Sequence, residues 1–147
     1  MLHKVKKFSA LSKEEKKLFL EAYVILGMTR AEILSTSFKQ LTRTLKHTTK
    51  PIVIPQLNKV QIDTARMIGK AIMRASSATP WESACLAQSL TAQKMLKKRG
   101  IPGVFYLGVM KENEIKVHAW SQCGEYIITG EGGHEAFSIL SVFEWKI

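Results

Sequence analysis

Hydrophobic residues recur every three or four positions over about the first hundred residues and every second position after that. The longest regular stretch is 79–100, TPWESACLAQSLTAQKMLKKRG. Thr79 and Glu82 have the spacing of a capping box, and Pro80 suits the first helical position. Gly100 suits a left-handed end after a basic last turn. The pattern therefore predicts one helix over 79–100.

This predicted helix carries a cysteine near its start. Steps of four, three and four residues place Cys85, Ser89, Ala92 and Leu96 on one face. A cysteine in this position is either a small buried hydrophobic residue or a nucleophile. The positive end of the helix and a nearby histidine would stabilise the thiolate of a nucleophile. The position alone leaves both interpretations open.

Three more helices are predicted upstream of this stretch. Capping-box patterns predict a helix over 12–27 and another over 29–45, and their short link predicts an antiparallel helical hairpin. The apolar period predicts a third helix over about 58–75. The segment 47–56 contains two prolines, so it is predicted to be an extended connection or a short edge strand between the helices over 29–45 and 58–75.

The alternating pattern in the last third of the chain predicts an antiparallel sheet. The middle two strands should form a hairpin closed at Cys123–Gly124. Helices followed by such a sheet make an α+β fold, with the cysteine-bearing helix packed on the sheet. We expect a helical hairpin and linker at 1–55 and the core at 56–147. The predicted strands are 104–110, 115–121, 125–129 and 136–143.

The composition agrees with one globular domain that has a helical extension. The chain has 147 residues, of which 46% are hydrophobic and 23% are charged. No apolar run approaches the roughly 18 residues of a membrane span, and the N-terminus has no secretion signal. The two cysteines could form a disulfide, but these features predict a cytoplasmic protein with reduced thiols.

The positive charge is concentrated in the first half of the chain. Residues 1–75 hold 15 lysines and arginines against 5 acidic residues, whereas residues 76–147 hold 7 of each. This excess is either a solvated helical surface or a docking face for an acidic peptide, protein or nucleic acid. Nucleic acid is not favoured, because few aromatic residues are interleaved with the basic ones and most fit apolar helix faces.

A histidine in the predicted hairpin changes the interpretation of the cysteine. His118 is either a half-buried strand residue or a base that lies beside Cys85. A helix that presents a sulfur, a strand that presents an imidazole and a third polar group form the arrangement of a thiol hydrolase. In the predicted register His118 pairs with Thr129, and Glu131 is the diagonal neighbour that could orient the ring.

The other histidines predict no metal site. His3, His47 and His134 are scattered without ligand spacing, so we expect neither a metal nor a cofactor. His134 is a competing candidate for the base but falls in a glycine-rich loop. Trp81 and Trp120 flank the proposed pair, where they either pack in the core or line a substrate groove.

Two segments resemble a known family. CLAQSLTAQKMLKKRGIPGVFYLGV and VHAWSQCGEYIITG resemble the transglutaminase-like leader peptidases of lasso-peptide biosynthesis. The resemblance covers roughly residues 60–145 and is loose over the first 55. It implies a papain-like fold and a protease that removes the leader from a ribosomally made precursor. It also implies a small leader-recognition protein and an ATP-using cyclase as partners.

The resemblance assigns the roles of two residues and leaves a third open. Cys85 matches the family's nucleophile and His118 its base. The family commonly has an aspartate about a dozen residues after the histidine, where this chain has Gly130. Glu131 is the nearest substitute, and Thr129 or a backbone carbonyl could also orient the ring.

The sequence thus predicts a cysteine peptidase that acts through Cys85, His118 and Glu131. The basic half of the chain would dock the leader or its recognition protein. Two alternatives remain open. One is a non-catalytic scaffold that presents the precursor to another enzyme, and the other is a basic nucleic-acid-binding protein.

Overall fold

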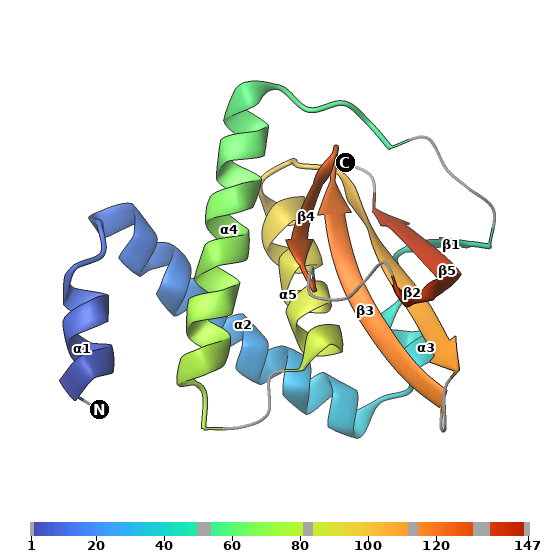
Figure 1. Ribbon diagram of the computed structural model, residues 1–147, viewed down its shortest axis with the longest axis horizontal. Coiled ribbons are helices and arrows are strands. Elements are labelled where there is room, and N and C mark those ends of the chain that lie inside the picture. The colour runs from blue at the N-terminus through green and yellow to red at the C-terminus, as the bar shows by residue number, and fades with distance from the viewer. Residues whose placement is uncertain (1, 50–53, 81–83, 112–114, 131–135, 146–147) are drawn as a thin grey trace.

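A computed structural model describes residues 2–49, 54–80, 84–111, 115–130 and 136–145 (Figure 1). Over these residues the chain forms helices and an antiparallel sheet, which confirms the predicted α+β class. The helices are α1 (Leu2–Ser9), α2 (Lys13–Ser35), α3 (Phe38–Leu41), α4 (Lys59–Ala78) and α5 (Cys85–Lys98). The strands are β1 (Lys46–Thr48), β2 (Gly103–Lys111), β3 (Ile115–Cys123), β4 (Tyr126–Thr129) and β5 (Ser138–Trp145).

The sheet has the strand order β1-β5-β2-β3-β4, and its neighbouring strands are antiparallel. The short strands β1 and β4 are the two edges. Strand β1 overlaps the start of the segment 47–56, for which an extended connection or a short edge strand was expected.

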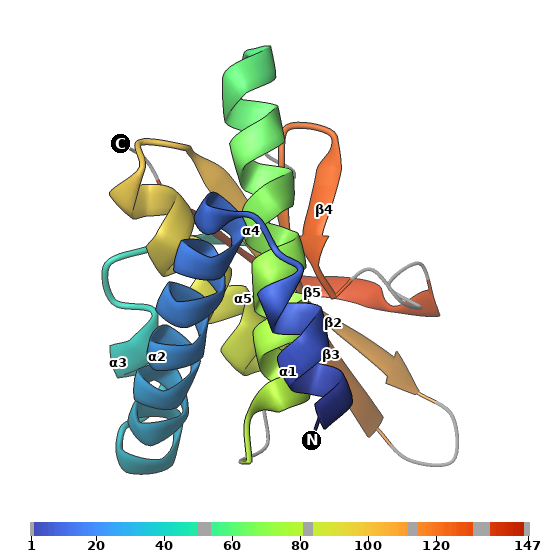
Figure 2. The ribbon, with the colours of Figure 1, turned by 90° about the vertical axis from the view of Figure 1, so that its left-hand side faces the viewer.

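Helix α5 lies between the sheet and the other long helices. It contacts β2, β3 and β4, and both α2 and α4 pack on it (Figures 1 and 2). Leu26, Ile72, Leu96 and Phe105 come from α2, α4, α5 and β2 and join one fully buried cluster. The predicted inward face of α5 is confirmed, because Ser89, Ala92 and Leu96 are completely buried. The cysteine-bearing helix is thus held from both sides.

Side-chain caps define the starts of two long helices. The Ser12 hydroxyl accepts a hydrogen bond from the Glu15 N–H at 3.1 Å, and Glu15 accepts one from the Ser12 N–H at 3.0 Å. Asn58 and Gln61 form the same capping box at α4. The predicted capping box at 12–15 is confirmed, and α4 begins where the pattern indicated.

The predicted helical hairpin over 12–45 is wrong. One continuous helix, α2, passes through the predicted link at 27–29 and ends at Ser35, and its Thr29 is fully buried instead of capping a second helix. Lys94 of α5 donates to the Thr29 hydroxyl at 3.2 Å and to Glu32 at 3.0 Å. A glycine inside a helix costs only about 1 kcal/mol. Packing against α5 therefore outweighs the turn signal at Gly27.

The predicted start of the cysteine helix at Thr79 is also wrong. Thr79 ends α4, and its N–H donates to the Ala75 carbonyl oxygen at 3.1 Å. A residue before proline avoids the helical conformation, and Thr79 before Pro80 is extended. Helix α5 instead begins at Cys85 itself. The correction moves the cysteine from the second turn of a helix to its first residue.

The predicted register of the β3–β4 hairpin is wrong. The turn is at 124–125 and not at 123–124, and an irregularity beside Ser121 shifts the pairing further. Thr129 consequently pairs with Ser121 and not with His118. Because side chains alternate along a strand, this odd shift places Thr129 and His118 on opposite faces of the sheet.

Candidate active site

Cys85 lies where the first turn of α5 meets the edge of β3. Its half-buried Sγ accepts a hydrogen bond from the Ala119 N–H at 3.4 Å. Strand β4 ends at Thr129, which pairs with Ser121, so no strand among the described residues pairs with Ala119 on that side. The sulfur occupies the position where the next strand residue would bond.

His118 directly precedes Ala119 in β3. The residue that bonds the Cys85 sulfur is therefore the next one along the chain from the imidazole. The His118 Nε2 atom lies 2.7 Å from the carbonyl oxygen of Gly130. A carbonyl oxygen only accepts hydrogen bonds, so Nε2 carries the proton. In the neutral ring Nδ1 is then the unprotonated nitrogen that can act as a base.

Two aromatic residues hold the His118 ring. Trp120 stacks with it at a centroid distance of 5.6 Å, and Phe137 lies 5.2 Å away at an angle of 33°. Gly108 makes room for both, since a Cβ there would lie 2.8 Å from the Trp120 ring and 2.9 Å from Phe137 Cβ. Of the two interpretations of Trp120, burial at 3% exposure favours packing, here directly against the imidazole.

Gly130 is a position that only glycine fits without rearrangement. Its φ of +77° lies in the left-handed region. A Cβ there would overlap the Ala119 carbonyl oxygen and lie 2.8 Å from Trp120 Cβ. An aspartate at this position would require the chain to move. The main chain places a carbonyl oxygen against the imidazole instead.

Thr129 and Glu131 were the other two candidates for the group that orients the His118 ring. The Thr129 hydroxyl faces away from His118 and bonds the Ser121 hydroxyl at 2.7 Å. Glu131 lies outside the described residues, so its predicted role remains a prediction. The backbone carbonyl of Gly130 is the ring contact that the structure places there.

A chain of buried hydroxyls ties α5 to the strands beneath the site. The Thr129 hydroxyl also bonds the Ser89 hydroxyl at 3.1 Å, and Ser89 and Ser121 are fully buried. Ser89 lies one helical turn after Cys85. These bonds fix the position of the cysteine relative to β3 and to Gly130.

The second cysteine has a different environment. Cys123 is 1% exposed, and burial raises the pKa of its thiol to about 12. Both cysteines are free thiols. Cys123 therefore stays protonated and unreactive at neutral pH, whereas Cys85 is within reach of small reagents.

The remaining predicted residues contribute little to this site. His47 is an exposed residue of β1 that stacks on Phe143 and bonds Ser141 at 3.1 Å. Trp81, His134 and the side chain of His3 lie outside the described part. Phe137 and Gly108 were missed by the sequence analysis, because only strand pairing brings them beside His118.

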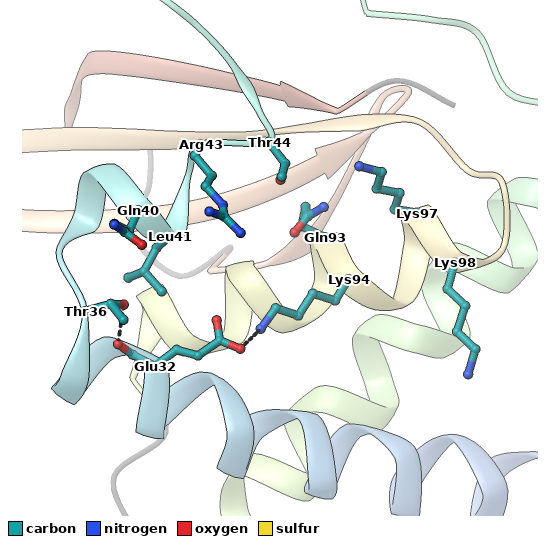
Figure 3. Close-up of a pocket in the computed structure, with 10 residues that line it drawn as sticks. All are labelled: Glu32, Thr36, Gln40, Leu41, Arg43, Thr44, Gln93, Lys94, Lys97 and Lys98. Carbon is teal, nitrogen blue, oxygen red and sulfur yellow. Dashed lines mark hydrogen bonds and ion pairs between the residues drawn. The ribbon is translucent and has the colours of Figure 1, made fainter.

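A separate basic pocket of about 590 Å³ lies between α2, the segment after α3, and α5 (Figure 3). Arg43 and Lys97 extend into it from opposite walls, and neither forms an ion pair with a described residue. Lys94 is paired with Glu32 at 3.0 Å. The lining residues are Glu32, Thr36, Gln40, Leu41, Arg43, Thr44, Gln93, Lys94, Lys97 and Lys98.

Two properties of the described residues bear on membrane spanning and metal binding. No helix among them combines the length and apolar character needed to cross a bilayer. Within the same residues, no three His, Cys, Asp or Glu side chains converge as metal ligands.

Comparison with known proteins identifies the family. No curated protein and no solved structure matched the chain. The family model of the transglutaminase-like superfamily matches residues 27–142, which is most of the chain. The match includes α5, β2, β3 and β4, and the superfamily typically comprises cysteine peptidases and transferases. The chain belongs to the transglutaminase-like superfamily and has its cysteine-protease type of fold.

Proposed function

We propose that the protein is a cysteine peptidase in which Cys85 is the nucleophile and His118 the base. One observation carries the proposal. Cys85 Sγ lies 3.4 Å from the main chain of the residue after His118, while the Gly130 carbonyl oxygen holds the protonated Nε2. This leaves Nδ1 unprotonated, as a base requires.

The first half of the reaction forms a thioester. His118 Nδ1 takes the proton of the Cys85 thiol, and the thiolate attacks the carbonyl carbon of the last leader residue. A C–S bond forms as the scissile C–N bond breaks. The imidazolium gives its proton to the leaving nitrogen, which becomes the amino terminus of the core peptide.

The second half releases the leader. His118 takes a proton from water, and the resulting hydroxide attacks the thioester carbonyl carbon. The C–S bond breaks, the leader leaves with a free carboxyl group, and the proton returns to the thiolate. The net reaction is hydrolysis of one peptide bond.

The start of α5 supports this mechanism. Ala84 is the N-cap of α5 and provides no side-chain hydrogen bond, whereas Ser12, Ser37 and Asn58 cap α2, α3 and α4. Replacing a polar N-cap by alanine usually costs about 0.5–2 kcal/mol. Ala84 thus leaves the first N–H groups of α5, including that of Cys85, without a cap from its own side chain, and under our proposal they bind the oxyanion.

The proposed substrate is the leader of a lasso-peptide precursor in the cytoplasm. The support is the resemblance over 60–145, together with a +10 charge that lies entirely in residues 1–75. An acidic segment of the leader, or of the small protein that recognises it, would dock on this basic half. An ATP-using cyclase would then close the ring of the released core.

The test follows the precursor by mass spectrometry. Cys85→Ala is expected to reduce leader release on the order of 10⁴-fold, because the nucleophile is lost. Cys123→Ala is the matched control and should retain activity, since its buried thiol lies outside the reacting pair. Release by Cys85→Ala at the wild-type rate would instead identify a non-catalytic scaffold.

The nucleic-acid alternative has its own signature. Binding to a duplex oligonucleotide that falls by orders of magnitude between about 50 and 200 mM salt, and that no peptide displaces, would support it. Under our proposal the precursor competes with the oligonucleotide.

A further inference from the structure

Strand β3 extends well beyond its outer neighbour. Strand β4 pairs with β3 only at 121–123, and Figure 1 shows β4 beside the C-terminal part of β3 alone. Over 115–117 no described residue pairs with the outer edge of β3, whereas at Ala119 the N–H bonds Cys85 and Gly130 lies against the carbonyl oxygen. This open edge ends at the Ala119 N–H, which reaches Cys85.

The β2–β3 register determines which main-chain N–H and C=O groups of β3 point toward this open edge. The Ala119 N–H points away from β2, since it donates to Cys85 Sγ. In an antiparallel pair every second residue shares that direction, and the β2–β3 register is unbroken from 111 to 104. The main-chain groups of Val117 and Ile115 therefore also face the open edge. Those of Lys116 and His118 face β2.

The side chains along the edge fit the same interpretation. Ile115 is 70% exposed and Val117 is 60% exposed. Both are apolar residues of the kind that favours strands, so they suit contact with a further strand. Neither a proline nor a second strand blocks this edge within the described residues. Unpaired strand edges of this kind are templates for the addition of another strand.

The geometry points to this edge as the substrate-binding site. We infer that an extended peptide adds to β3 over 115–117 as a further strand and brings its scissile carbonyl to Cys85, which bonds the next outward N–H, that of Ala119. Residues two apart in a strand are separated by about 6.6 Å, so the path from Ile115 to Ala119 spans about 13 Å and accommodates about four substrate residues. The inference rests on the proposed peptidase function and extends it.

This binding mode specifies the class of substrate. Main-chain hydrogen bonds require an unfolded, extended segment and are indifferent to its sequence. Contacts with Ile115 and Val117 favour apolar side chains at alternate substrate positions. Folded proteins and prolines at the pairing positions are excluded.

Amide hydrogen exchange tests the inference directly. We would measure exchange by NMR for the Cys85→Ala protein with and without its precursor peptide. The amides of Ile115 and Val117 should exchange fast in the free protein and slow at least about tenfold when the peptide binds. The amides of Lys116 and His118 serve as internal controls, because β2 already protects them. Unchanged exchange at 115 and 117, or equal slowing at all four, would overturn the inference.

A second variant separates the edge from the chemistry. Val117→Pro removes the N–H that faces the edge, and proline is tolerated at such positions. We expect kcat/KM for the precursor to fall at least about tenfold, whereas iodoacetamide, which needs no strand pairing, should alkylate Cys85 at the wild-type rate. Val117→Thr keeps the N–H and changes only the side chain, so it should lose less kcat/KM than Val117→Pro.

The possible results fall into separate classes. Equal loss of alkylation and cleavage in Val117→Pro, or no loss of cleavage, would overturn the edge as the binding site. Concentration-dependent protection of 115 and 117 without peptide would show that a second copy of the chain occupies the edge, which also overturns it. Cleavage by Cys85→Ala overturns the peptidase function itself, independently of the edge.

Discussion

At the scale of single residues, the chain differs from the leader-peptidase family that it resembles chiefly at position 130, where it has a glycine instead of an aspartate. A carboxylate beside the imidazole would stabilise the imidazolium by charge, whereas a carbonyl oxygen orients the ring only by accepting a hydrogen bond from its N–H. A thiolate is itself a strong nucleophile, so a thiol–imidazole pair can function with a neutral third group. The close contact of Gly130 with Ala119 and Trp120 makes this third group part of the backbone.

Two substitutions distinguish the carbonyl from the predicted carboxylate. Gly130→Ala should reduce kcat for leader release at least about tenfold, because the new Cβ displaces the carbonyl from His118. Glu131→Gln keeps the size of the side chain and removes only its charge, so kcat should stay within about threefold of wild type. The measurement is single-turnover cleavage of the precursor.

The opposite pattern would restore the sequence-based assignment. If Glu131→Gln loses activity and Gly130→Ala retains it, Glu131 orients the ring and the contact with the Gly130 carbonyl is incidental. Thermal unfolding of both variants identifies any loss that comes from instability.

At the scale of elements, the relation of α5 to β3 and β4 determines the site. Three buried hydroxyls form this connection, with Thr129 bonded to both Ser89 and Ser121. Thr29 and Thr91 form a second buried hydroxyl pair, at 3.5 Å, on the side of α5 that faces α2. The helix therefore has polar contacts on two sides, and only one lies beneath the active site.

These two contacts give a matched pair of variants. Thr129→Val leaves the hydroxyls of Ser89 and Ser121 without their shared partner, which should cost about 1–3 kcal/mol of unfolding free energy. It should also reduce kcat severalfold, since Thr129 precedes Gly130 and fixes α5. Thr91→Val should lower stability less, because Lys94 still donates to the Thr29 hydroxyl, and should leave kcat unchanged. Denaturant unfolding and leader-release kinetics measure the two effects, and equal kcat values would show that the hydroxyl chain only stabilises the fold.

At the scale of the whole molecule, the positive charge and the proposed catalytic residues come from different parts of the chain. The excess positive charge lies in residues 1–75, whereas Cys85, His118 and Gly130 lie in the electrically balanced second half. The basic pocket joins the two parts, since its walls come from α2, the segment after α3, and α5. An acidic peptide docked there would contact both halves.

Charge reversal tests where the acidic partner docks. Arg43→Glu with Lys97→Glu should raise KM for the precursor at least about tenfold without changing kcat, because neither residue reaches the reacting atoms. The comparison variant reverses Lys13, Lys16 and Lys17 at the start of α2. A KM effect in the comparison variant alone would place docking at α2, and no effect in either would leave the charge as a solvated surface.

Local sequence signals predicted the elements more accurately than their boundaries. The capping box at Ser12, the inward face of α5 and the alternation in the last third depend only on neighbouring residues, and all are present in the fold. The signals at Thr29 and Thr79 have the same local form but did not start helices. Packing of Thr29 against Lys94 and the proline after Thr79 decided those cases.

The sequence by itself determined the fold class, the cysteine-bearing helix and the presence of a histidine on a neighbouring strand, because propensity and periodicity are local properties. Tertiary structure alone decided that Cys85 bonds the main chain beside His118 and that Gly130 supplies the oxygen on its ring. Both contacts depend on where β4 ends and on an irregularity in its pairing with β3. A one-residue change in register reverses which face a side chain occupies, and packing across the whole sheet sets that register.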